Sequence, residues 1–201
     1  MIKNIIFDLG NVLINFRPDL FIAKFTKDTA IINRFLSNII KTNTWVQLDR
    51  GTISLEQARK RFLADHPEER ELIELFFNRW KELLTSIPKN VKILRNLKLK
   101  GYNLYVLSNY INEAYDYVKE KYDFFSLFDG IVISSKVKLV KPESEIYRYI
   151  LHKYNLNPEE SIFIDDTEEC ILQANKLKLN TIHYLPHINL KVEFKKLGIR
   201  I

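Results

Sequence analysis

Five short apolar segments, separated by longer stretches with helical spacing, constrain the fold of this chain more than any other feature. They are continuous apolar runs without polar–apolar alternation, as in strands that are covered on both faces of a parallel sheet. The segments are residues 3–7, 104–107, 130–133, 161–164 and 181–184. Strands that alternate with helices are typical of βαβ units. The sequence therefore predicts an α/β fold, a Rossmann-like doubly wound parallel sheet.

The interval from about residue 15 to residue 85 has a different pattern, because helical spacing continues there without a strand-like run. We predict helices there at 19–27, 31–41, 54–64 and 68–84. Ser54 and Gln57 form a capping-box pattern at the start of the third helix. We therefore expect a core of residues 1–14 and 86–201 with a small all-α helical cap domain over residues 15–85. Further helices are predicted in the core at 91–100, 114–121, 144–154 and 168–178, with a closing amphipathic helix and tail over 188–201.

The composition of the chain restricts where the protein works and what it binds, and says little about its activity. Cys170 is the single cysteine, which excludes an intrachain disulfide, and no apolar stretch approaches the ~20 residues of a membrane span. We expect a cytoplasmic protein, a monomer or homodimer, that does not bind membranes. The formal net charge of +6 fits either a lysine-rich surface or attraction to anions. The basic residues are dispersed and no nucleic-acid motif is present, so we expect a small phosphorylated metabolite as the partner and no nucleic acid.

Polar side chains follow four of the predicted strands at or near the point where each strand ends. In open α/β sheets, ligands bind at the carboxyl ends of the strands. The residues in these positions are Asp8, Leu9 and Gly10, then Ser108 and Asn109, then Lys141, and then Asp165 and Asp166. We expect three carboxylates, one hydroxyl and one ammonium group to share a small site.

Each of these groups has a chemical use in phosphoryl transfer. A carboxylate such as Asp8 can attack phosphorus and form an aspartyl-phosphate. Together with Asp165 and Asp166 it offers the hard oxygen ligands that suit Mg²⁺. Lys141 adds positive charge next to the transferring group. The Ser108 hydroxyl and the backbone N–H groups of Leu9 and Gly10 can donate hydrogen bonds to phosphate oxygens.

Four motifs carry a resemblance to a known family. They are residues 7–12 (Phe-Asp-Leu-Gly-Asn-Val), 107–109 (Leu-Ser-Asn), 141–143 (Lys-Pro-Glu) and 164–166 (Ile-Asp-Asp). In order and spacing they resemble the motifs of the haloacid dehalogenase (HAD) superfamily, in the phosphatase branch that has a helical cap inserted after the first motif.

The resemblance implies Mg²⁺-dependent hydrolysis of a small phosphate monoester, a sugar phosphate being one candidate, through an aspartyl-phosphate. It makes Asp8 the nucleophile and gives Ser108 and Lys141 the task of holding the phosphoryl group, with Asn109 in support. It makes Asp166 a direct metal ligand beside Asp8. It gives Asp165 a metal-bound water or Lys141 to hold, and it completes the metal site with the main-chain carbonyl of Gly10.

Gly10 departs from the family pattern, in which an aspartate at this place transfers the proton. Losing such a group typically costs ~10²–10⁴-fold in rate. Three interpretations are open. The substrate has a good leaving group; or a water or a cap residue such as Asp49, Arg50 or His66 substitutes; or the protein is a weakly active or non-catalytic relative that binds phosphorylated ligands. The cap residues expected to face the substrate are Phe16, Trp45, Asp49 and Arg50.

Overall fold

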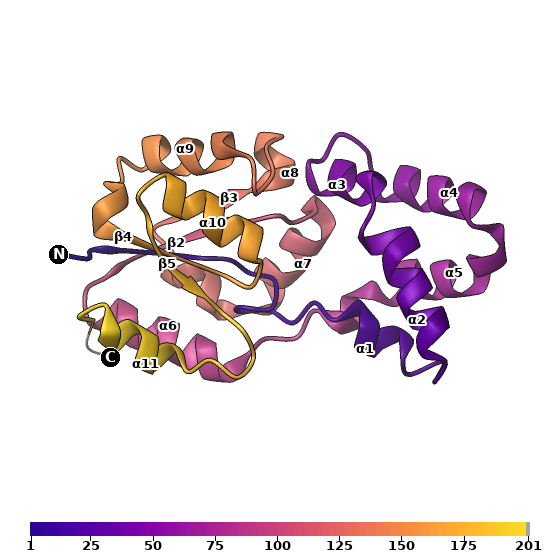
Figure 1. Ribbon diagram of the computed structural model, residues 1–201, viewed down its shortest axis with the longest axis horizontal. Coiled ribbons are helices and arrows are strands. Elements are labelled where there is room, and N and C mark those ends of the chain that lie inside the picture. Colours follow the sequence, from indigo (N-terminus) through magenta and orange to yellow (C-terminus); the bar gives the residue numbers. More distant parts are fainter. Residues whose placement is uncertain (200–201) are drawn as a thin grey trace.

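A five-stranded parallel sheet forms the centre of the computed structural model, which describes residues 1–199 (Figure 1). Its strand order is β3-β2-β1-β4-β5, so the first strand lies in the middle and the connections run outward to both sides. The strands are β1 (Asn4–Phe7), β2 (Asn103–Ser108), β3 (Gly130–Ile133), β4 (Ser161–Asp165) and β5 (Asn180–His183). Phe7 at the end of β1 aligns with Val106 on one side and Ile164 on the other. The predicted doubly wound sheet is confirmed.

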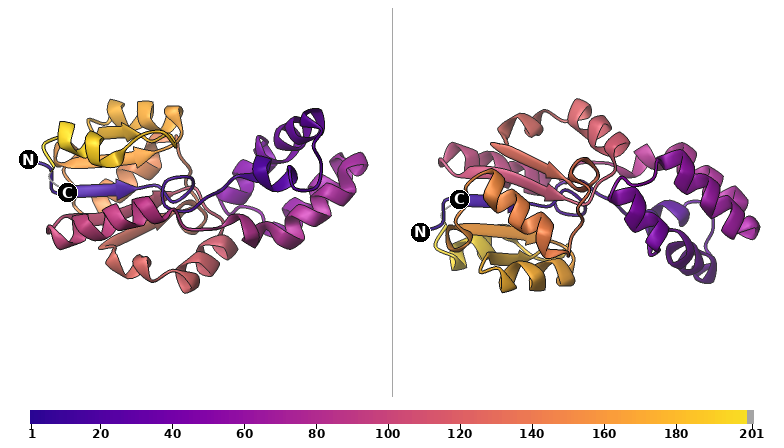
Figure 2. Two further views of the ribbon diagram at one scale, coloured as in Figure 1. Left: turned by 90° about the horizontal axis from the view of Figure 1, so that it is seen from below. Right: turned by 90° about the horizontal axis from the view of Figure 1, so that it is seen from above.

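Helices cover both faces of this sheet (Figures 1 and 2). Ile5 and Phe7 belong to one apolar cluster and Ile6 to the other, because neighbouring side chains of a strand point to opposite faces. The first cluster contains buried residues of α6 (Pro88–Leu99), α7 (Asn112–Lys121) and α11 (Leu190–Lys196); the second contains those of α9 (Ser144–Lys153) and α10 (Glu168–Lys176). This burial on two sides explains the continuous apolar runs of the sequence.

The helices between residues 18 and 83 lie beyond the carboxyl ends of the strands, apart from the sheet (Figure 1). Aromatic rings of this region pack around Phe76, whose ring centroid lies 5.4 Å from that of Phe35 and 6.0 Å from that of Trp45. The helices are α1 (Pro18–Ile22), α2 (Thr29–Phe35), the π-helix η1 (Leu36–Ile40), α3 (Asn43–Asp49), α4 (Leu55–Asp65), the 3₁₀ turn η2 (Pro67–Glu69), α5 (Arg70–Arg79) and η3 (Trp80–Leu83).

We refer to this helical region of residues 18–83 as the cap region, and several of its helix boundaries differ from those predicted. The predicted helix over 19–27 ends at Ile22, because Asp28 caps α2 by accepting from the N–H groups of Ala30 and Ile31. The predicted helix over 31–41 begins earlier, at Thr29, and widens into η1. The predicted helix over 68–84 is divided into α5 and η3.

Helix α3 was not predicted. Its N-cap is Thr42, whose hydroxyl accepts from the Trp45 N–H at 3.2 Å. The helix has only seven residues and offers little helical periodicity, so the sequence does not reveal it. By contrast, the capping box of Ser54 and Gln57 is present at the start of α4.

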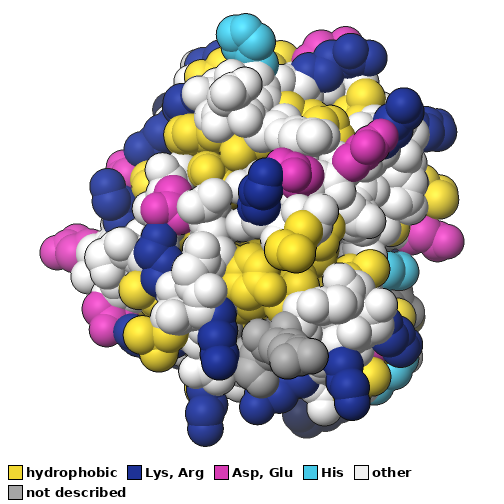
Figure 3. Space-filling model, turned by 90° about the vertical axis from the view of Figure 1, so that its left-hand side faces the viewer, with side chains coloured by type: hydrophobic (Ala, Val, Ile, Leu, Met, Phe, Trp, Pro, Cys, Tyr) yellow, Lys and Arg dark blue, Asp and Glu magenta, His cyan; other side chains and the backbone are white. Residues whose placement is uncertain are grey.

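Two surface properties bear on possible partners. On the face at the amino ends of the strands, Lys and Arg side chains are interspersed with Asp and Glu (Figure 3). None of the helices in residues 1–199 is both long enough and apolar enough to cross a membrane. Residues 200–201 of the predicted tail lie outside the described part of the chain; within it, α11 provides the predicted closing helix.

Gly130, at the start of β3, supports a close contact with the loop after α9. A Cβ at this position would collide with the ring of Tyr154, whose hydroxyl accepts from the Ile131 N–H at 3.0 Å. We expect Gly130→Ala to lower the free energy of unfolding by about 2 kcal/mol, as overpacking does, and the melting temperature by roughly 5 °C. Thermal unfolding checks this. The double substitution Gly130→Ala with Tyr154→Leu should lose less than the sum of the two single changes; strict additivity would contradict the collision.

Candidate active site

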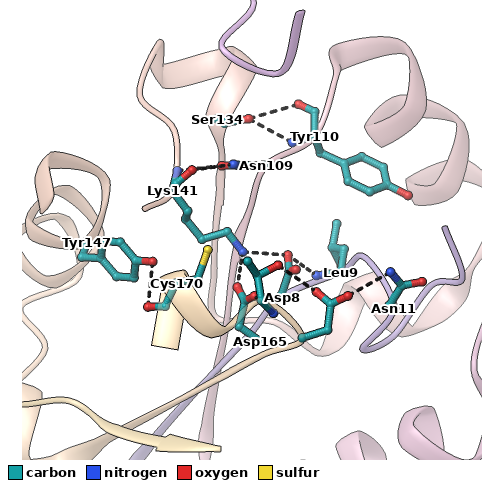
Figure 4. A network of polar contacts seen from close by, with 12 residues as sticks. Asp8, Leu9, Asn11, Asn109, Tyr110, Ser134, Lys141, Tyr147, Asp165 and Cys170 are labelled. Atoms are coloured by element: carbon teal, nitrogen blue, oxygen red, sulfur yellow. Dashed lines mark hydrogen bonds and ion pairs between the residues drawn. The ribbon is translucent and has the colours of Figure 1, made fainter. Parts of the chain in front are cut away.

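The polar groups predicted at the strand ends converge on one small site (Figure 4). Asp8 follows β1 directly, Ser108 closes β2 and Asp165 closes β4. Because these three strands are neighbours in parallel register, their carboxyl ends lie side by side. Lys141 arrives from the segment after β3, beyond the short helix α8 (Ser134–Val137). All four of these residues are buried.

Lys141 is held between two carboxylates. Its Nζ lies 3.0 Å from Asp8 Oδ1 and 2.5 Å from Asp165 Oδ2. Asn109 fixes the lysine backbone by two hydrogen bonds, since it accepts from the Lys141 N–H at 2.8 Å and donates to the Lys141 carbonyl at 2.9 Å. Burial alone would lower the pKa of Lys141, but Asp165 and Asp8 outweigh it and raise that pKa well above its usual value. The lysine is therefore a fixed positive charge.

The carboxylates of Asp8, Asp165 and Asp166 form a compact cluster. Each offers an oxygen within 4.8 Å of the others, which suits a hard cation. Burial raises the pKa of Asp8 to about 7; Lys141 opposes this effect, while Asp165 and Asp166 add to it. Burial likewise raises the pKa of Asp166. Without a cation the cluster is a costly concentration of negative charge, so its donor set fits a divalent metal.

Asp166 is oriented by a neighbour that sequence reasoning missed. Asn11 donates through Nδ2 to Asp166 Oδ2 at 2.9 Å and accepts through Oδ1 from the Phe16 N–H at 3.0 Å. One side chain thus connects the metal-side carboxylate to the chain entering the cap. Asn11 adopts a left-handed backbone conformation, with φ of 51°, which asparagine tolerates better than most residues. Its position within the first motif, residues 7–12, is the sequence feature that could have identified Asn11 as a site residue.

Two buried hydroxyls near the cluster have no hydrogen-bond partner among residues 1–199. They are Ser108 Oγ and Tyr110 Oη. A buried polar group without a partner is uncommon and calls for a ligand or water. Ser108 was predicted to donate to phosphate; Tyr110, only two residues later, was overlooked. The Leu9 N–H, expected to face phosphate, instead donates to Asp8 Oδ1 at 2.7 Å.

A cavity opens beside Gly10, between the sheet and the cap. Its lining includes Gly10 and Asn109 from the core and Asp49 from the end of α3. A Cβ added to Gly10 would meet nothing closer than Asp8 Oδ2 at 3.8 Å, so there is room where the family pattern has a side chain. Asp49 is half-buried at this cavity. Desolvation, followed by the negative charge of Asp8, raises the pKa of Asp49 to about 7.

Three contacts between cap and core hold Asp49 in this place. The Ser134 hydroxyl, which is buried, donates to the Asp49 carbonyl at 2.6 Å and accepts from the Tyr110 N–H at 2.9 Å. Arg50 forms a two-pronged ion pair with Glu143, with N–O distances of 2.8 and 2.5 Å. Lys138 donates to the carbonyl of the glycine after Arg50.

Only some of the cap residues expected to face the substrate line this cavity. Phe16, Trp45 and Asp49 line the cavity, whereas Arg50 is directed to Glu143. His66 ends α4 and does not line it. Of the three candidates for proton transfer, only Asp49 therefore faces the site.

Cys170, the single cysteine, is buried behind the carboxylates. Burial raises the pKa of its thiol to about 12, so it is neutral. Its carbonyl accepts from the Tyr147 hydroxyl at 3.1 Å, which ties α10 to α9. The thiol here packs rather than reacts.

Known proteins resemble the chain over nearly its full length. A sesquiterpene phosphatase of Aspergillus oryzae is 26% identical over 97% of this chain and 96% of its own. A D-ribitol-5-phosphate phosphatase of Bacteroides thetaiotaomicron is 24% identical over 90% of this chain and 91% of its own. Among solved structures, a HAD family enzyme of B. thetaiotaomicron in complex with magnesium and inorganic phosphate has a TM-score of 0.73 at 23% identity, covering 96% of this chain and 100% of that one. The family model of the haloacid dehalogenase-like hydrolases matches residues 2–176. The chain belongs to the haloacid dehalogenase-like hydrolases.

Proposed function

We propose that this hydrolase cleaves a small phosphate monoester through a phosphorylated Asp8. One observation carries the proposal: Lys141 lies between Asp8 and Asp165, next to a buried Ser108 hydroxyl that has no partner in residues 1–199. This arrangement places a nucleophile, a fixed cation and a hydrogen-bond donor around one position. It suits a dianionic phosphoryl group better than any neutral ligand.

The reaction has two steps. In the first, an Asp8 carboxylate oxygen bonds to phosphorus while the bond from phosphorus to the ester oxygen breaks, and the departing alcohol gains a proton. In the second, water attacks the same phosphorus, loses a proton, and releases inorganic phosphate together with the free Asp8 carboxylate. Ser108 and Lys141 hold the phosphoryl oxygens in both steps. Asp165 fixes the position of the lysine.

Mg²⁺ is the cation that we propose for the carboxylate cluster. Asp8 and Asp166 would hold it, with the Gly10 carbonyl and with Asp165 at its outer side. When bound, the ion neutralises phosphoryl charge and thereby permits an anionic nucleophile to approach an anionic ester. The magnesium and phosphate of the B. thetaiotaomicron enzyme support this assignment.

Asp49 takes the proton-transfer role that Gly10 cannot perform. It lines the same cavity as Gly10, on the cap side. With a pKa of about 7, its protonated and ionised forms are both populated near neutrality. It would donate to the leaving oxygen in the first step and accept from water in the second. The helices of residues 15–85 would then act as a cap that closes the site.

The names of two relatives bear on the organic group of the ester. One is a sesquiterpene phosphatase and the other a D-ribitol-5-phosphate phosphatase. A sugar phosphate is accordingly one candidate. The alternative is a weakly active or non-catalytic protein that binds phosphorylated ligands, an alternative that Gly10 favours. A phosphatase assay with and without Mg²⁺ separates these proposals.

Metal dependence is the direct test. We expect hydrolysis of acetyl phosphate to require Mg²⁺ and to stop in EDTA, and we expect Mg²⁺ to raise the melting temperature because it binds only the folded carboxylate cluster. Asp166→Asn should raise, by about tenfold or more, the Mg²⁺ concentration that gives half of the full activity and half of the rise in melting temperature. Asp116→Asn, at an exposed position on α7, is the matched control and should change neither. Turnover that is unaffected by EDTA would rule out the metal.

A further inference from the structure

We propose that the ester taken by this site carries an apolar alkyl or prenyl group next to the phosphate rather than a sugar. This inference rests on the proposed phosphatase function and specifies its substrate class. The observation that leads to it is the composition of the cavity beside Asp8, and the arrangement of the few polar groups within it.

Apart from the indole N–H groups of Trp45 and Trp80, the cavity walls away from Asp8 are hydrocarbon. Most of the lining residues come from the cap, Leu84 lies where the chain returns to the core, and two residues lie at the start of α7. These residues are Phe16, Trp45, Leu55, Phe76, Phe77, Trp80, Leu84, Ile111 and Ala114. The rings also pack on one another, with centroid distances of 5.9 Å between Phe16 and Trp45 and 6.0 Å between Trp45 and Phe76. Such walls are shaped and apolar before any ligand enters.

The size of the cavity limits the group that it can hold. Its volume is about 130 Å³. An apolar protein cavity of ~150 Å³ is known to bind benzene. The space is therefore matched to about five or six carbons of the organic group, counted from the phosphate.

Polar side chains of the cavity are confined to the end near Asp8. Asn109 follows Ser108 at the end of β2, and both Asp49 and Tyr110 lie close enough to Asp8 for its charge to raise their pKa values. Asn109 is already bonded to the Lys141 backbone, so Asp49 and Tyr110 are the groups available to the phosphate and the ester oxygen. A sugar would direct its remaining hydroxyls at walls whose donors are limited to the indole N–H groups of Trp45 and Trp80, so most of these hydroxyls would lose water without gaining partners. An alkyl group loses nothing there and removes apolar surface from water.

The experiment compares two esters that both release a primary alcohol. We would measure kcat/KM for 3-methylbutyl phosphate and for ribitol 5-phosphate with Mg²⁺, with acetyl phosphate as the reporter of basic phosphatase activity. We expect the alkyl ester to be preferred by at least about tenfold, the scale on which an apolar pocket discriminates. The polyol is the better leaving group of the two, so a preference for the alkyl ester would reflect the pocket.

Two variants connect the preference to the cavity. Leu55→Asn introduces a polar group at the half-buried start of α4 and should lower kcat/KM for 3-methylbutyl phosphate about tenfold, with little effect on acetyl phosphate. Ala114→Leu fills the cavity from α7 and should raise KM for the alkyl ester in the same selective way. Leu172→Asn is the matched control, because Leu172 is an exposed residue of α10.

The outcomes separate the two proposals. Hydrolysis of acetyl phosphate with equal or better turnover of ribitol 5-phosphate would overturn the apolar substrate class while leaving the phosphatase function in place. The apolar substrate class would also be overturned if Leu55→Asn and Ala114→Leu, both folded, lower kcat/KM equally for all three substrates. If neither ester nor acetyl phosphate is hydrolysed in a Mg²⁺-dependent way, the proposed function itself is overturned.

Discussion

Asp8→Asn is expected to reduce phosphate ester hydrolysis by about 10⁴-fold or more, the scale seen when a covalent nucleophile is removed. The amide cannot form the acyl phosphate, whereas the surrounding contacts can persist: Lys141 keeps Asp165 at 2.5 Å, and Asn109 still holds the lysine backbone. Steady-state kinetics with acetyl phosphate measures the loss. Removal of a buried carboxylate whose pKa is raised to about 7 also means that the variant should not be less stable than the parent at pH 8 without metal.

The covalent intermediate gives a second, independent readout. Acid quenching of the parent protein during turnover, followed by peptide mass spectrometry, should place one phosphoryl group on the peptide that contains Asp8. The same experiment on Asp8→Asn should find none. The control is Asp116→Asn, which changes the same functional group on the exposed side of α7. Full activity in Asp8→Asn, or a phosphoryl group on another residue, would contradict the mechanism even if the protein is a phosphatase.

The part of the site built on the sheet could be predicted from sequence for a physical reason. Asp8, Ser108 and Asp165 each end a short apolar run, and parallel strands bring such ends together whatever the intervening chain does. The position of Lys141 follows from the next strand in order. Here local pattern and topology are sufficient: the doubly wound fold was predicted correctly, and that fold brings these side chains together.

The part of the site contributed by the cap could not be predicted in this way. Asp49 reaches the cavity because its carbonyl is held by Ser134 and the following Arg50 is paired with Glu143, residues 85 and 93 positions away. No periodicity in the sequence encodes such contacts. The ranking of Asp49 over Arg50 and His66 therefore required the structure, as did the Tyr110 hydroxyl, which has no partner within the described residues.

Asp49→Asn is expected to lower kcat about 10²–10⁴-fold for an alkyl phosphate, the usual cost of losing a general acid and base. The loss should be smaller for acetyl phosphate, because its leaving carboxylate departs without a proton. Asp65→Asn, at the exposed end of α4, is the matched control within the cap. An equal loss of kcat for the alkyl phosphate and for acetyl phosphate would indicate that Asp49 positions the substrate and does not transfer the proton.

The pH dependence of catalysis should carry the same signature. With a pKa of about 7, Asp49 is protonated below neutrality and loses its proton above it. Activity that requires the acid form should therefore fall as pH rises through about 7, and this falling limb should disappear in Asp49→Asn. A limb that is unchanged in the variant would assign the titration to another group.

The substitution Asp49→Asn should change stability in the opposite direction from activity. The folded state raises the pKa of Asp49 from 3.8 to about 7, so between these values the folded protein binds more protons than the unfolded chain. The free energy of unfolding consequently falls as pH rises through this interval. Asparagine has no such penalty. Without metal, Asp49→Asn should therefore unfold at a higher temperature than the parent at pH 8, and the difference should vanish near pH 4. A variant that is less active yet more stable at pH 8 cannot owe its lost activity to misfolding. The two measurements together would therefore identify Asp49 as a carboxylate that serves the activity and lowers the stability.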